Sequence, residues 1–391
     1  MTRRGLQVLQ GIREVPEQAW DALLDGQATP FVRWAWLDAL ESSGCASPRA
    51  SWTPHHLTLW KDGALVAAAP AYLKDGSDGD FSRDWGWSNA AVEAGLSYYP
   101  KLVVTVPFTP VSGRRVLVAE GEDRAASTQA LMEGALALAK KQGIATVQVL
   151  FPDADDLGRL EQSGLIGRVD FQYHWFNQSY PTTDAFLARF NSKHRNMLKR
   201  ERGMPAKQGI ALRAVRGDEL ATDPKKWAKL AHTLHRATVD KLMWGRRWLN
   251  EKFYQGIFAA MPENLEVVVA EREGNPVAGA FNVADGYRLF GRYWGCLEEH
   301  PFLHFNVCYY HSIDECIRRG TRVFEGGAGG EHKVARGFEP SLTYSAHAFL
   351  DPRFEKAMRK HLARERDERE ASLEAWKQES PLFKRGTQGV G

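Results

Sequence analysis

Two stretches of the chain share the same order of apolar and polar positions. Residues 57–73 contain an apolar run, a polar turn with a glycine, and a second run rich in small residues. Residues 267–283 repeat this order, and Val277 and its neighbours correspond to Val66 and the alanines after it. Short apolar runs joined by a glycine turn are typical of paired antiparallel strands. The sequence therefore predicts a β-hairpin in each half of the chain.

A second pattern of helix, glycine and strand follows in each half. Residues 135–151 predict a helix that stops at Gly143 and then a β-branched strand, and residues 310–327 predict the same around Gly320. Glycine after a basic last turn is typical of a helix C-terminus. We infer an α/β (α+β) fold made of a duplicated unit, with helices first and then a mixed, mostly antiparallel sheet crossed by one helix.

The two expected units differ in length and are followed by a charged tail. Residues 181–184, Pro-Thr-Thr-Asp, predict a turn and an N-cap at the join between the two units, followed by one helix at about residues 185–202. After the second unit, Phe354, Met358 and Leu362 have helical spacing, and the chain then becomes almost wholly charged. The expected segments are residues 1–180 with an insertion at about 75–126, residues 181–350, and a helical tail at 351–391.

Composition narrows the class of protein. Of the 391 residues, 43% are hydrophobic and 25% are charged, which is typical of a soluble globular protein and excludes a disordered or coiled-coil chain. The 51 Lys and Arg residues nearly balance the 48 Asp and Glu residues, so we expect neither a DNA-binding protein nor a polybasic membrane anchor.

Cysteine spacing and hydropathy suggest the compartment. The four cysteines include no CxxC pair and no zinc-like grouping with histidine, so we expect no disulfide framework and no metal site. No apolar run approaches the ~18 residues of a membrane span, and the N-terminal residues lack the apolar core of a signal peptide. These features predict a cytoplasmic protein without a membrane-spanning segment.

The first candidate site is a basic stretch at residues 191–202. It carries five cations, Lys193, Arg195, Lys199, Arg200 and Arg202, against one acid. On a helix, three of them at i, i+4 and i+7 would form one cationic stripe. Such a stripe is either a solvated face or a site for the phosphates of a nucleotide, a lipid pyrophosphate or a tRNA.

The second candidate site is the glycine-rich stretch at residues 324–340. A strand is expected to end at Glu325, and four glycines follow within five positions. Glycine is costly to order, so this run is either a mobile loop or backbone that lies close to a ligand. A cluster of general bases and cations comes next, with Glu331, His332, Lys333 and Arg336.

A third region is the helix expected at residues 303–319. Its buried stripe is predicted to include Phe305, Tyr309, Ile313 and Cys316. An adjacent stripe would overlook a cleft, and it consists of His304, Cys308, His311 and Glu315.

The fourth candidate lies in the first-half insertion, which is long enough to favour a function. Its aromatic residues form either a pocket wall or part of the core, and two charged residues would orient a ligand. The set consists of Asp84, Trp85, Trp87, Tyr98, Tyr99 and Lys101.

These and neighbouring blocks resemble the FemAB-like family of peptidoglycan biosynthesis/recognition. They include DWGW, YYPKL, VPFTPVSGRR, KHRNMLKRER, GRYWGC, LHFNVCYY and FEGGAGGEHKVARGFEP, and the resemblance extends from about residue 28 to residue 350. The family lies within the GNAT N-acyltransferases and is more distantly similar to the Fem aminoacyl-tRNA transferases. The resemblance implies tandem GNAT-like domains, which agrees with the duplication.

The resemblance also implies roles for two regions. In the Fem transferases a basic helix opens the second GNAT unit, as residues 191–202 do here. A lysine after the glycine-rich strand end contributes to substrate or tRNA-end binding there, and Lys333 matches it, although the preceding residue is His332 rather than the usual aromatic.

The sequence shows no clean loop for the pyrophosphate of coenzyme A. Arg292 and Gly295 fit the opening of such a loop, but no second small residue follows, and Glu298 and Glu299 would compete with phosphate. In the first half, a strand is expected between Arg115 and the helix start. We therefore favour an aminoacyl-tRNA-like donor, with acyl-CoA as the alternative, and expect no tightly bound cofactor.

The resulting hypothesis is an enzyme that transfers an acyl or aminoacyl group to an amine of a small molecule or peptide, such as a cell-wall precursor. The base would be Glu325 or Glu331, with His332 as a rival, and Lys333 would stabilise negative charge. The alternative is a non-catalytic module that binds a peptidoglycan precursor or a peptide.

The residues expected to bind the substrates come from all the candidate regions. They are Lys193, Arg195, Lys199 and Arg202 for the donor, Arg336 for negative charge, Arg292, Tyr293 and Trp294 at the loop, and the six residues of the insertion set.

Overall fold

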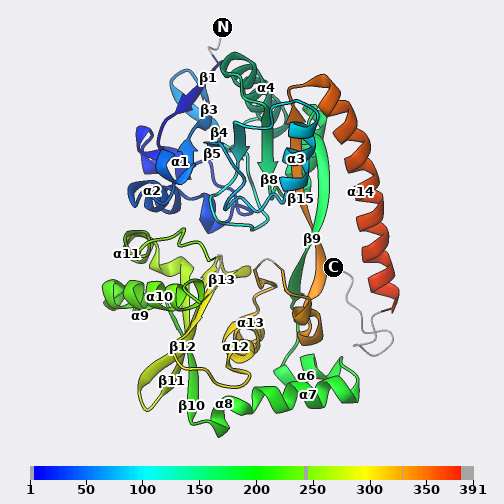
Figure 1. Ribbon diagram of the computed structural model, residues 1–391. Coiled ribbons are helices and arrows are strands. Elements are labelled where there is room, and N and C mark those ends of the chain that lie inside the picture. The colour runs from blue at the N-terminus through cyan, green and yellow to red at the C-terminus, as the bar shows by residue number, and fades with distance from the viewer. Residues whose placement is uncertain (1–3, 242–244, 328, 380–391) are drawn as a thin grey trace. The chain divides into compact units, whose positions relative to one another are not determined.

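The computed structural model describes residues 4–241, 245–327 and 329–379, and it forms two compact units (Figure 1). Unit 1 consists of Met1–Asp170 and Leu342–Glu370, and unit 2 consists of Phe171–Ser341 and Ala371–Gly391. The division falls within strands β9 (Ile166–Phe176) and β15 (Glu339–Phe349) and within helix α14 (Pro352–Glu379). The domain boundaries at residues 180 and 350, which we placed from the repeated sequence pattern, stay a prediction.

Unit 1 contains two sheets and a set of helices. One sheet has the strand order β1-β3-β4-β7, and the other includes the order β15-β8-β6-β5-β2. The strands are β1 (Arg4–Leu9), β2 (Thr53–Pro54), β3 (His56–Lys61), β4 (Ala64–Ala69), β5 (Ala71–Lys74), β6 (Lys101–Val104), β7 (Leu117–Val118) and β8 (Thr146–Leu150). The helices are α1 (Glu17–Asp21), α2 (Trp34–Ser42), α3 (Trp85–Glu93), α4 (Arg124–Gln142) and α5 (Ala154–Gln162).

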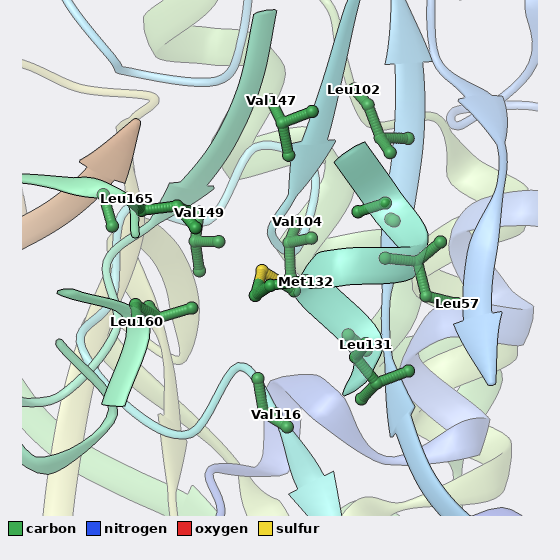
Figure 2. Packing of buried hydrophobic residues seen from close by; sticks show 14 of the residues in the cluster. Leu57, Leu102, Val104, Val116, Leu131, Met132, Val147, Val149, Leu160 and Leu165 are labelled. Atoms are coloured by element: carbon green, nitrogen blue, oxygen red, sulfur yellow. The ribbon is translucent and has the colours of Figure 1, made fainter. Parts of the chain in front are cut away.

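The core of unit 1 forms where α4 covers the strands. Met132 of α4 is fully buried in one cluster with Val104 of β6 and Val149 of β8, and Figure 2 shows these side chains gathered around it. The predicted hairpin is confirmed by β3 and β4, which pair antiparallel up to Lys61 and Ala64. Gly143 ends α4 in the left-handed conformation, as its place after a basic turn predicted.

Strands β6 and β8 of unit 1 are parallel, and the chain segments that follow them pair again. Strand β6 pairs with β8 as far as Val104 and Val149, and Gly113 then forms a parallel bridge with Pro152. The guanidinium of Arg115, which is 1% exposed, fills the space between these segments. It donates to the backbone oxygens of Leu150 at 2.8 Å, of Gly113 at 3.3 Å, and of Val111. Arg115 therefore links the end of β8 to the segment that follows β6.

Unit 2 is built on a sheet with the order β10-β11-β12-β13-β14-β9. All pairs are antiparallel except β13 with β14. The strands are β10 (Ile210–Arg216), β11 (Leu265–Arg272), β12 (Asn275–Ala284), β13 (Arg288–Cys296) and β14 (Val323–Glu325). The helices are α6 (Thr183–Ala188), α7 (Ser192–Arg202), α8 (Met204–Lys207), α9 (Gly217–Thr222), α10 (Pro224–Val239), α11 (Glu251–Ala260), α12 (Leu303–Phe305) and α13 (His311–Arg319).

Several predicted elements of unit 2 are confirmed, and one is divided. Strands β11 and β12 form the expected hairpin, and Gly320 ends α13. The helix expected at residues 303–319 is present, with a π-helical segment at Asn306–Tyr310 between α12 and α13. The segment predicted as one helix around residues 185–202 is two helices, because the side chain of Asn191 accepts from the backbone nitrogen of His194 at 3.0 Å and caps a new start.

The predicted tail helix is α14. Phe354, Met358 and Leu362, the three apolar positions at helical spacing, are buried in a hydrophobic cluster of unit 1. The remaining tail residues after Glu379 lie outside the described part of the chain. None of the described helices has the length and apolar character that crossing a bilayer requires.

Candidate functional site

A cavity of about 180 Å³ lies in unit 2 where strand β13 separates from β14. Strands, the helical segment after β13 and the glycine-rich stretch all contribute to its wall. The lining residues are Ala280, Asn282, Gly291, Arg292, Tyr293, Trp294, His304, Cys308, Tyr309, Gly326 and Gly327.

The register of the strands explains why the sheet opens here. Strand β13 pairs with β14 only from Arg288 to Phe290, because β14 ends at Glu325. On its other edge, β13 bulges at Arg292, since Tyr293 faces Phe281 while Gly291 faces Asn282. A bulge bends a strand and redirects its side chains. The two strands diverge, and the cavity occupies the gap.

Glycines keep the gap open. Gly326 and Gly327 continue from β14 across the opening, and Gly327 has a φ of +81°, which favours glycine. A Cβ atom on Gly326 would lie 2.8 Å from the ring of Phe338, and one on Gly327 would lie 3.4 Å from the oxygen of Gly291. The glycine-rich sequence therefore brings backbone close to the cavity, which is one of the two uses that we considered for it.

The helical side of the cavity carries neutral polar groups. Burial raises the pKa of the Cys308 thiol, and burial lowers the pKa of His304 to about 4. The hydroxyl of Tyr309 lies 3.1 Å from Nε2 of His332. Burial raises the pKa of Tyr309, while burial and the nearby Arg336 lower the pKa of His332. A neutral imidazole therefore faces a protonated phenol at neutral pH.

Of the cleft-facing stripe predicted on the helix, His304 and Cys308 line the cavity. His311 and Glu315 are not among the lining residues, and Glu315 is paired with Arg318 at 2.6 Å. Tyr309, which periodicity assigned to the buried stripe, also lines the cavity. The π-helical segment inserts an extra residue per turn and so changes the face that these residues present.

Lys333 lies beside the glycine backbone. Its side chain is 2% exposed, and Nζ donates to the backbone oxygen of Gly327 at 2.5 Å. Burial lowers its pKa to about 8, against a smaller opposing effect of Cys308. The lysine predicted from the sequence is thus held next to a residue that lines the cavity.

Glu325 lies opposite a histidine that sequence reasoning missed. Strands β14 and β9 pair Glu325 with His174, and Nε2 of His174 lies 3.8 Å from Oε2 of Glu325. Burial, with the charge of Lys333 as a smaller cause, lowers the pKa of His174 to about 3. Because more than 140 residues separate the two positions, only the strand pairing reveals this contact.

Arg292, Tyr293 and Trp294 all line the cavity, but they lie on strand β13 rather than in the loop that the sequence analysis expected. The ring of Trp294 lies 4.5 Å from that of His304, and the ring of Tyr293 lies 4.0 Å from that of His235 on α10. These contacts fix the two aromatic rings against elements on either side of β13. The cavity therefore has rigid aromatic walls.

Much of the cationic stripe on α7 is paired within unit 2. Arg202 donates to both carboxylate oxygens of Asp314 at 2.8 Å, and Lys199 lies 3.2 Å from Asp184. Lys193 and Arg200 are exposed beside the stripe, and Arg195 of the stripe is half-buried. The exposed cations are accessible to an anion.

Arg336 is held by protein. Its Nη2 lies 2.9 Å from Oε2 of buried Glu201, and its guanidinium lies 3.3 Å from the ring centre of Phe305. The hydroxyl of Tyr310 also donates to Glu201. Because Glu201 already neutralises it, we assign Arg336 to the support of the site rather than to direct charge stabilisation. The side chain of Glu331 lies outside the part of the chain that the structure describes.

The residues of the insertion set belong to unit 1 and are mostly core. Lys101 and Asp84 are fully buried and lie 2.7 Å apart, and Tyr98 donates to Asp84 at 2.7 Å. Trp87 is buried against His347. Tyr99 bonds to Ser77, and Trp85 is exposed. Asp84, Trp87, Tyr98 and Lys101 therefore act as interior residues, because their charges and rings are satisfied by each other rather than turned toward a ligand.

Comparison with known families identifies the chain. Residues 11–385 match the FemAB-like family model, which is described as peptidoglycan biosynthesis/recognition. The chain belongs to the FemAB-like family. No curated protein has a sequence that matches this FemAB-like protein.

Solved structures agree on the fold. FemX is 12% identical with a TM-score of 0.53, and the match covers 88% of this chain and 98% of FemX. L-PGS from Bacillus licheniformis is 10% identical with a TM-score of 0.50, and the match covers 88% of this chain and 99% of L-PGS. The FemAB-like protein shares the fold of these two proteins, which agrees with the tandem GNAT-like domains that the resemblance implies.

Proposed function

We propose that unit 2 transfers an acyl or aminoacyl group to an amine, with the acyl group bound in the cavity between β13 and β14. The observation that carries this proposal is the separation of two parallel strands around a cavity lined by glycine backbone. Strand ends that separate leave backbone groups without sheet partners, so a ligand can use them. The family description supports a role in peptidoglycan chemistry.

The reaction requires three steps from the protein. A base takes a proton from the ammonium form of the acceptor, and the free amine nitrogen then bonds to the acyl carbon. The resulting oxyanion collapses as the bond to the donor breaks, and a proton of the amine nitrogen passes to the leaving oxygen or sulfur. Hydrogen-bond donors must face the oxyanion while it exists. Each of these tasks has a candidate near the cavity.

His332 and Glu325 are the two described candidates for the base. His332 is exposed, but it bonds to the hydroxyl of Tyr309, which lines the cavity. A proton from the amine can pass to Tyr309 as Tyr309 gives its own to His332, and His332 then releases it to water. Glu325 ends β14 beside Gly326 and faces His174. The hydrogen bond to a cavity-lining residue favours His332.

Lys333 is the candidate for stabilising the oxyanion. With a pKa of about 8, its ammonium is mostly charged at pH 7. It bonds to Gly327 at the cavity wall, so a small movement would bring it to a reacting oxygen. Backbone amides of the glycine-rich stretch would supply further donors, as they do in oxyanion sites generally.

The donor is expected to carry a phosphorylated handle, either an aminoacyl-tRNA-like molecule or acyl-CoA. Lys193 and Arg195 supply the cations of α7 that are open to such a handle, and Arg292 supplies one at the cavity. The acceptor would be an amine on a small molecule or peptide, and the family description favours a cell-wall precursor.

A thermal-shift screen and a transfer assay test the proposal. The screen uses coenzyme A, an RNA minihelix that ends in CCA, and UDP-sugar peptides, because a ligand at 100 times its Kd adds about 2.7 kcal/mol of stability. The assay then measures transfer of labelled acyl groups by the wild type and by Glu325→Ala, Glu331→Ala, His332→Ala and Lys333→Ala. Undiminished transfer in all four variants would contradict the assigned site. Saturable binding with no product from any donor would instead favour a non-catalytic binding module.

A further inference from the structure

Asn282 contributes a polar side chain from strand β12 to the cavity wall. It lies in β12 within the apolar run Val277–Ala284, and it is only 1% exposed. Its strand neighbours are Glu266 on one side and Gly291 on the other. A Cβ atom on Gly291 would lie 3.3 Å from the ring of Phe324, so this position suits a glycine. Both Asn282 and Gly291 line the cavity.

The hydrogen bonds of Asn282 fix the direction of its amide. Nδ2 donates to Oε1 of Glu266 at 3.0 Å and to the hydroxyl of Ser312 at 3.5 Å. An amide nitrogen has two hydrogens, so both are used. A carboxylate only accepts hydrogen bonds, so the amide oxygen cannot take the place of Nδ2 beside Glu266.

Glu266 is itself paired with two cations. It is fully buried, and its Oε2 lies 2.7 Å from Nη1 of Arg319 and 3.4 Å from Nε of Arg216. Breaking a buried ion pair is costly, so these contacts hold the carboxylate in place. The orientation of Asn282 is therefore set by a partner that is not among the residues lining the cavity.

The amide oxygen is left for a ligand. Among the hydrogen bonds of the described residues, none ends on Oδ1 of Asn282. Asn282 lines the cavity, and a ligand that fills the cavity would exclude water from this oxygen. An acceptor left unpaired in that way is costly, so a hydrogen-bond donor from the ligand would be favoured at this place. An acyl group without such a donor would leave Oδ1 unsatisfied.

We propose that Asn282 selects acyl groups that carry a hydrogen-bond donor, a hydroxyl or an amine, on the carbon next to the carbonyl. This inference rests on the proposed function, because it assumes that the acyl group occupies the cavity. The selectivity follows from the fixed acceptor: a site built to bond a ligand hydroxyl or amine rejects the analogue that lacks it. Asn282 is then a specificity residue.

The test measures binding of stable analogues in which an amide replaces the reactive bond. Propionyl, lactoyl and alanyl groups differ in having no donor, a hydroxyl or an amine at the same carbon. Each is attached through an amide to the 3′ end of an RNA minihelix ending in CCA, and to coenzyme A. Calorimetric titration of the full chain gives a Kd for each analogue.

We expect the lactoyl or the alanyl analogue to bind at least about tenfold more tightly than the propionyl analogue on the same handle. Which of the two is preferred identifies the donor as a hydroxyl or an amine. In Asn282→Leu, which keeps the volume but removes the acceptor, this ratio should fall to about one. The matched control is Asn264→Leu, which removes an amide bonded to the backbone oxygen of Ala284 outside the cavity lining and should keep the ratio.

The outcomes separate the two proposals. Equal binding of all three acyl groups to the wild type, or an unchanged ratio in Asn282→Leu, would overturn the specificity role and leave acyl transfer in place. Failure of every analogue on both handles to bind would overturn the proposed function and the inference with it. The readout is a ratio between ligands, so a general loss of stability in the variant does not imitate the expected result.

Discussion

The hydroxyl of Tyr309 and Nε2 of His332 form a 3.1 Å hydrogen bond that joins the cavity to an exposed side chain. The sequence analysis placed Tyr309 in the buried stripe of a helix and His332 after the glycine-rich stretch. It therefore did not predict that these two side chains contact each other. The bond gives the cavity a route to solvent for a proton.

Breaking this hydrogen bond should slow the reaction. General acid–base catalysis contributes about 10²–10⁴-fold, and Tyr309→Phe and His332→Ala should each lower kcat within that range because both remove the same route. The double variant should be no slower than the slower single variant. Steady-state transfer assays check this, with His300→Ala as a control that keeps the pair.

Equal activity of the wild type and both single variants would exclude the route through Tyr309 and leave Glu325 and Glu331 as candidates for the base. In that case Glu325→Gln or Glu331→Gln should show the loss instead. The four variants together assign the base without a bound ligand.

Lys333 should make stability depend on pH in a defined window. Its pKa is about 8 in the folded chain and 10.5 when unperturbed, so between these values the unfolded chain binds more protons. Stability contributed by this group therefore rises with pH from about 8 to 10.5, and below pH 8 the buried charge imposes its full cost. Lys333→Met should be more stable than the wild type at pH 7, by up to about 3 kcal/mol.

Urea unfolding at several pH values measures this effect. The difference between Lys333→Met and the wild type should shrink as pH rises through the window. Lys252→Met, which removes an exposed lysine in the same unit, should give a constant difference. A difference for Lys333→Met that does not vary with pH would contradict the lowered pKa.

The core of unit 1 should depend on Lys101. Its ammonium lies 2.8 Å from Asp80 and 2.7 Å from Asp84, and all three side chains are fully buried. Removing one partner of a buried ion pair costs about 3–5 kcal/mol, because the remaining charge is left without compensation. Lys101→Met should lose hydrogen-exchange protection in β6 and β8, whereas Lys141→Met at an exposed position should keep it. Unchanged protection in both variants would show that the carboxylates are neutralised in another way.

The contact between α10 and β13 should not tolerate a methyl group at Gly295. A Cβ atom there would lie 1.8 Å from the backbone oxygen of Leu234, so the helix must move. We expect Gly295→Ala to lower stability by about 3 kcal/mol. Gly158→Ala in α5 is the control, since no atom lies within 4 Å of the added carbon. Equal unfolding midpoints for the two variants would contradict this packing.

Local sequence patterns predicted the helices and strands well. The contacts at the candidate site depend on pairing between residues that are far apart in the sequence. The hairpins, the glycine helix stops at Gly143 and Gly320, and the cavity-lining Arg292 follow from short stretches of sequence. His174 could not be found in this way, because it reaches Glu325 only through the pairing of β9 with β14. Asn282 left a signal, a lone amide in an apolar strand, whose meaning depends on the distant Glu266. The charges of Arg202 and Arg336 looked available because their partners, Asp314 and Glu201, face them only in the fold.

The buried guanidinium of Arg115 has a consequence for substitutions in unit 1. It donates to four backbone oxygens, those of Leu150, Gly113, Arg114 and Val111, so a small residue at this position would leave all four without this donor. One side chain therefore links the end of β8 to the segment that follows β6, and a single substitution would remove all of its links at once.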